Sequence, residues 1–149
     1  MANDSDAATR QMVRYPLGGI ETIIGLTALV GGVLMVIEPG GEALGLSLLW
    51  LGKTPFSDYA VPGLVLALLF GAGNLFGAFL AFMNYEFAGE VAGFLGMGMM
   101  VWVMMQVWLF IPTSWIQPTF FTLGALQFIL GVIWLRTRWN QTSRRPIWP

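Results

Sequence analysis

The 149-residue chain has room for a single domain, and its composition is that of a protein in contact with lipid. Hydrophobic residues make up 56% and charged residues 10%, whereas soluble domains carry about 25% charged residues. The formal net charge of −1 gives no basic footprint for nucleic acid. Without cysteine or histidine the chain lacks disulfides and the commonest metal and haem ligands, so we expect no metal site and no cofactor.

Four apolar runs predict an all-α fold, a bundle of four transmembrane helices that forms one domain over residues 1–149. The runs cover about residues 17–37, 59–83, 87–111 and 117–136. Each approaches the ~20 residues that a helix needs to cross ~30 Å of hydrocarbon. The alternation typical of β-barrel strands is absent, and backbone N–H groups in lipid need internal partners, so helices are predicted.

The first run carries a glutamate on a face of small residues. Glu21 follows Gly18 and precedes Gly25 and Ala28 at steps of three and four, which predicts that its side chain points into the bundle. An ionisable residue within a span is a candidate functional residue. The structural alternative is an ion pair with Arg14 or with an arginine after the fourth run.

The connection after the first run is long, and residues 43–51 within it are rich in leucine. This segment is too short to span the bilayer and predicts an interfacial or re-entrant helix at the outer surface. Loops of this length are often functional, and the alternative is a lid that plugs the outer end of the bundle. The candidate residues of this loop are Glu42, Trp50, Lys53 and Asp58.

The later runs supply three further polar candidates. Asn74 and Gln127 lie in line with glycine and alanine near mid-membrane, where the two amides would hydrogen-bond across the core or contact a ligand or ion. Glu90 lies near the start of the third run. There it would either form a proton site together with Glu21 or be stabilised by the helix dipole.

The positive charges predict the orientation. Six of the seven lysines and arginines flank the four runs at the two ends of the chain, and Lys53 alone lies in a loop. An even number of spans puts both ends on one face, and the positive-inside rule makes that face cytoplasmic. Aromatic residues predict an outer belt of Trp50, Trp108 and Trp115, and an inner belt of Tyr15, Tyr85, Trp134 and Trp139.

The first loop and the start of the second run carry a resemblance. The segments are Glu38-Pro39-Gly40-Gly41, Thr54-Pro55-Phe56-Ser57-Asp58-Tyr59 and Pro62-Gly63-Leu64. Over roughly residues 18–135 the chain resembles a group of small bacterial four-helix integral membrane proteins that are usually described as hypothetical. The resemblance implies the same architecture and a bacterial inner membrane, and it implies no activity or binding residue.

Three functional hypotheses follow. The first, which the lack of a catalytic constellation favours, is a non-enzymatic accessory or scaffold component of a larger membrane assembly, whose partners are the lipid bilayer and other subunits or further copies of the chain. The second is a small oligomeric transporter or channel for a small solute or a proton. The third is a lipid- or quinone-binding membrane protein or a lipid-modifying enzyme, with its site in the outer loop at Glu42, Lys53 and Asp58. Methionines in the third run supply adaptable contact surface for the first hypothesis: Met97, Met99, Met100, Met104 and Met105.

Overall fold

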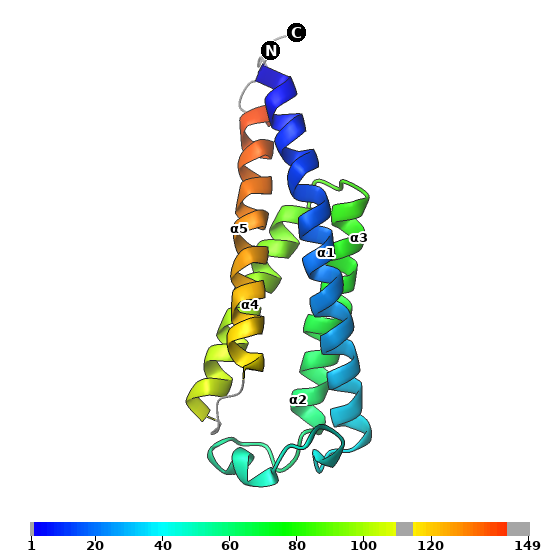
Figure 1. Ribbon diagram of the computed structural model, residues 1–149, viewed down its shortest axis with the longest axis vertical. Coiled ribbons are helices and arrows are strands. Elements are labelled where there is room, and N and C mark those ends of the chain that lie inside the picture. The colour runs from blue at the N-terminus through cyan, green and yellow to red at the C-terminus, as the bar shows by residue number, and fades with distance from the viewer. Residues whose placement is uncertain (1, 110–114, 143–149) are drawn as a thin grey trace.

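The computed structural model describes residues 2–109 and 115–142, and the side chains of residues 8–109 and 115–137. Over these residues the fold is all-helical and contains no strand. The elements in chain order are α1 (Ala2–Ile37), η1 (Glu42–Leu44), η2 (Leu48–Lys53), α2 (Ala60–Val65), η3 (Leu66–Ala72), α3 (Gly73–Phe82), α4 (Ala88–Leu109) and α5 (Ile116–Thr142). The start of α1 and the end of α5 lie at the same end of an elongated bundle (Figure 1).

The prediction of four helices that are long and apolar enough to cross a membrane is confirmed. These stretches are Ala8–Ile37, Ala60–Phe82, Ala88–Leu109 and Ile116–Thr137. The shortest have 22 residues, which at 1.5 Å per residue gives ~33 Å. Helix α1 begins well before residue 17 and continues through Pro16.

The second long apolar stretch, Ala60–Phe82, changes its helical geometry at mid-length. Helices α2 and α3 are joined by η3, a π-helical segment in which the Gly73 N–H donates to the Leu68 carbonyl five residues back. Pro62 lies in the first turn of α2, where its missing N–H costs little. The sequence did not predict the π-helical turns, which often mark functional sites. Here they end at Ala72, two residues before Asn74.

The helices pack as two glycine-lined pairs. In the first, α1 packs against α2, η3 and α3, and a Cβ added at Gly63 would lie 2.8 Å from the Gly32 carbonyl oxygen. In the second, α4 packs against α5, and a Cβ at Gly96 would lie 2.6 Å from the Gly124 carbonyl oxygen. Only glycine permits such close approach of two backbones, so each pair depends on the glycines at its contact.

Two apolar clusters hold the pairs together. The terminal-end cluster consists of Val13, Leu17, Leu80, Ala81, Ala88, Ala92 and Trp134. The loop-end cluster consists of Ile24, Ala28, Phe70, Met99 and Val103. Trp134 is completely buried in the first cluster, so its predicted place in the inner aromatic belt is wrong. Its ring lies 5.6 Å from the Arg10 guanidinium, a cation–π contact inside the bundle.

The long first loop folds back on Tyr59. Two 3₁₀-helices, η1 and η2, occupy the region where a short helix was predicted. The Tyr59 hydroxyl donates to the Ser47 carbonyl at 2.8 Å, and the Tyr59 N–H donates to the Pro39 carbonyl at 3.0 Å. Burial raises the pKa of the Tyr59 phenol above its ordinary value. The hydroxyl and the backbone N–H of buried Tyr59 therefore hold the loop against the start of α2.

Candidate functional site

Three polar side chains meet at the centre of the bundle. Glu21 from α1, Asn74 from α3 and Gln127 from α5 are each 0% exposed. Gln127 Nε2 donates to Asn74 Oδ1 at 2.8 Å and lies 3.3 Å from Glu21 Oε1. We call these three residues the polar triad. The predicted amide–amide bond is confirmed, and the contact between Gln127 and the glutamate extends it to a third helix.

Neighbouring residues fix how the polar triad is oriented. Asn74 Nδ2 donates to the Phe70 carbonyl one turn back at 2.8 Å, which turns the Asn74 carbonyl oxygen toward Gln127. Gly77 follows Asn74 by three residues, and a Cβ added there would lie 2.6 Å from Glu21 Oε1. The glycine thus leaves space for the carboxyl, which a larger residue would displace.

Two acceptor atoms of the triad have no partner. Glu21 Oε2 and Gln127 Oε1 are buried and form no hydrogen bond. Arg14, one predicted partner of Glu21, instead donates to the Phe82 carbonyl. The other predicted partners follow the fourth span; Arg136 is exposed, and the side chains of Arg138, Arg144 and Arg145 lie outside the described residues. Within the described part of the chain the Glu21 carboxyl therefore has an amide as its polar partner.

Apolar layers enclose the polar triad on both sides. On α1, Leu17 lies one turn before Glu21 and belongs to the terminal-end cluster, while Ile24 lies one turn after it and belongs to the loop-end cluster. Both side chains are 0% exposed. Among the side chains that the structure describes, these layers interrupt any polar route from the triad toward either end of the bundle.

Glu90 does not join the other intramembrane candidates. It is exposed in the first turn of α4, whereas Glu21 is completely buried. The structure therefore does not form the predicted proton site of two carboxylates. An acidic residue in a first turn matches the alternative, in which the positive end of the helix dipole stabilises it.

The outer-loop candidates lie on η1, on η2 and just before α2. Glu42 begins η1 and Lys53 ends η2, and both are exposed. Trp50 is partly buried within η2. Asp58 Oδ1 accepts a hydrogen bond from the Ala60 N–H at 3.0 Å, so this carboxylate satisfies a free N–H at the start of α2. Of these four residues, Asp58 thus has a local structural role at the start of α2.

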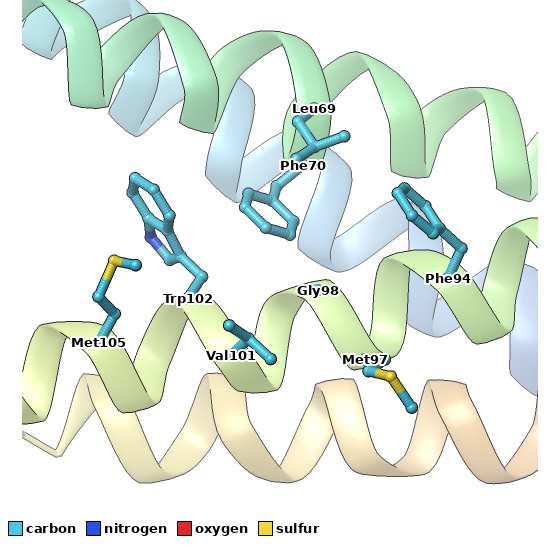
Figure 2. Close-up of a pocket in the computed structure, with 8 residues that line it drawn as sticks. All are labelled: Leu69, Phe70, Phe94, Met97, Gly98, Val101, Trp102 and Met105. Carbon is cyan, nitrogen blue, oxygen red and sulfur yellow. The ribbon is translucent and has the colours of Figure 1, made fainter.

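An apolar groove between η3 and α4 was not predicted from the sequence. It has a volume of about 320 Å³ and is lined by Leu69, Phe70, Phe94, Met97, Gly98, Val101, Trp102 and Met105. Figure 2 shows Phe70 and Trp102 projecting from opposite helices, with ring centroids 5.7 Å apart. The α4 residues recur at steps of three and four, a helix-face pattern that was available in the sequence.

Comparison with protein-family models, with curated proteins and with solved structures finds no match for this chain. Among the described residues, no group of three or more histidine, cysteine, aspartate or glutamate side chains is placed to hold a metal ion. The polar triad joins α1, α3 and α5 through amide hydrogen bonds. Such bonds contribute ~0.6 to 2 kcal/mol each between helices in membranes, so the geometry suits a clamp.

Proposed function

We propose that this protein is a non-enzymatic, multi-pass integral membrane protein that serves as an accessory or structural subunit of a larger membrane assembly. The observation that carries the proposal is the complete burial of Glu21, Asn74 and Gln127 against one another. Residues that act on a substrate need access to it. These three side chains are instead used to hold the protein's own helices together.

The same burial disfavours the transporter hypothesis. A permeation path is lined by polar groups that a solute or water can reach, and here apolar clusters enclose the polar triad. Purified protein in liposomes is therefore expected to give no flux of protons or small solutes. Flux that disappears in Glu21→Gln would favour transport over the proposal.

The outward side of α4 supports lateral contact with another protein. Phe94, Val101 and Met104 are each more than half exposed. Helices in lipid associate through close packing rather than through the hydrophobic effect, and methionine and aromatic side chains provide large adaptable surfaces for it. The expected partner is a transmembrane helix of another subunit, packed against the groove between η3 and α4.

The test is the mass of the protein extracted from its native membrane in mild detergent. The proposal predicts a complex above the 16.4 kDa monomer. Phe94→Ala combined with Val101→Ala should release the monomer. Leu26→Ala combined with Val30→Ala, which removes exposed apolar side chains from α1, should not. A folded wild type that migrates only as a monomer, or equal loss in both variants, would contradict the proposal.

The groove also favours a second candidate function, the binding of a lipid or quinone. Its volume of about 320 Å³ falls at the lower end of the ~300 to 1,000 Å³ typical of small-molecule pockets. Gly98 lines the groove, whereas a Cβ added at Gly93 on the same helix would meet nothing within 4 Å. Gly98→Leu should therefore lower the lipid or quinone that co-purifies, and Gly93→Leu should not. Equal amounts in both variants would remove this candidate.

A further inference from the structure

The Glu21 carboxyl lacks the donors that a buried carboxyl requires. Its Oε1 atom lies 3.3 Å from Gln127 Nε2, and that amide nitrogen also donates to Asn74 at the shorter distance of 2.8 Å. Its Oε2 atom and the Gln127 Oε1 atom are buried without a partner. Two unpaired acceptors on side chains already in contact leave the centre of the bundle rich in lone pairs and poor in donors.

No positive side chain on the described parts of the packed elements compensates the carboxyl. The span formed by α2, η3 and α3 contains no charged residue, and the only one in α4 is the exposed Glu90. On α5, the exposed Arg136 lies nine residues beyond the triad amide, ~13.5 Å along the axis. On α1, Arg14 lies seven residues, ~10.5 Å, before Glu21 and Arg10 lies further still, and both are engaged near the terminal-end cluster.

A bare carboxylate in this position would be an uncompensated charge inside two apolar layers, which is strongly unfavourable. We propose that Glu21 holds a small monovalent cation, either a proton or a sodium ion. A proton on Oε2 supplies the missing donor, and the unpaired Gln127 Oε1 is an acceptor within the same cluster. A sodium ion would be coordinated by carboxylate and amide oxygens, the hard ligands that such an ion prefers.

The position of the cation gives it a structural role. Glu21, Asn74 and Gln127 come from three different helices, so occupancy of the site strengthens the contact among α1, α3 and α5. The π-helical segment η3 ends two residues before Asn74, and π-helical turns are frequent at functional sites. The assignment adds a ligand to the polar triad and does not depend on any partner subunit.

The test is the melting temperature of purified protein between pH 6 and pH 9, in sodium chloride or in choline chloride at equal ionic strength. A cation that binds only the folded state raises the melting temperature with its concentration. If the cation is a proton, the melting temperature falls as pH rises and sodium has no effect. If it is sodium, each tenfold increase in sodium raises the melting temperature. Glu21→Gln should abolish either response, and Glu90→Gln should preserve it.

Two results would overturn the proposal: a wild-type melting temperature independent of both pH and sodium, or a dependence that persists in Glu21→Gln. If that variant does not fold, infrared spectra of protein with ¹³C-carboxyl glutamate keep the test decisive, because Glu21 is completely buried and the other four glutamates are exposed or partly exposed. A protonated carboxyl band marks the proton, and a sodium-induced shift of a carboxylate band marks sodium. Spectra with neither feature overturn the proposal.

Discussion

Replacement of Gln127 by leucine tests the polar triad as a clamp. Leucine has a similar size and cannot form hydrogen bonds, so Gln127→Leu removes the bond to Asn74 at 2.8 Å and the longer contact to Glu21 at 3.3 Å. Both partners are 0% exposed and would lose their donor without gaining water. The substitution therefore removes hydrogen bonding while the apolar layers on both sides stay in place.

The expected loss in the free energy of unfolding follows from these two bonds. Interhelical hydrogen bonds in membranes average about 0.6 kcal/mol and reach about 1.7 kcal/mol. Two bonds therefore give a loss of about 1 to 3 kcal/mol. Removal of the unpaired Gln127 Oε1 atom offsets part of this loss, whereas the unpaired oxygens left on Glu21 and Asn74 add to it.

Reversible unfolding in mixed detergent micelles, followed by tryptophan fluorescence, measures the change. Gln106→Leu is the matched control, because Gln106 lies on α4 and is partly exposed; its effect should stay within about 0.5 kcal/mol. A Gln127→Leu protein as stable as the wild type would show that the triad does not hold the helices together.

Three further predictions concern the packing and the loops. Gly96→Ala should destabilise the protein by about 1 to 3 kcal/mol because its Cβ would lie 2.6 Å from the Gly124 carbonyl, whereas Gly93→Ala should be neutral in the same unfolding assay. Tyr59→Phe should cost about 1 kcal/mol. Because burial raises the pKa of this phenol, its contribution should be complete below ~pH 10 and disappear as pH rises further, as measured by unfolding against pH. Asn84→Val should cost about 1 to 2 kcal/mol in that assay because residue 84 has φ 57°, and Asn84→Gly should not.

The four helices were predictable because the apolar runs are long and the charges between them few. Each run appears as a helical stretch that is apolar enough to span a membrane. The extension of α1 to Ala2 was not predicted, since its polar first residues carry no hydropathy signal and Asn, Asp and Ser are weak helix formers. The π-helical turns of η3 were also not predicted, because packing against neighbouring helices decides between α and π geometry.

The candidate site was predicted in part. Periodicity placed Glu21, Asn74 and Gln127 on inward faces, and burial confirms each placement. Periodicity does not give the depth of one helix relative to another, so it could not predict that the glutamate contacts an amide rather than Arg14. The prediction for Trp134 was wrong for a related reason. Its position near a helix end suggested the membrane–water interface, but its completely buried ring lies in the core.

The most direct test of the whole account is the topology of the chain in the membrane. The protein has no cysteine, so single cysteines introduced as Gln11→Cys, Lys53→Cys and Asn84→Cys can be probed in intact cells with a membrane-impermeant maleimide. We expect Lys53→Cys to react from outside, and Gln11→Cys and Asn84→Cys to react only after permeabilisation. Labelling of Gln11→Cys and Lys53→Cys from the same side would contradict a bundle of four membrane-spanning helices.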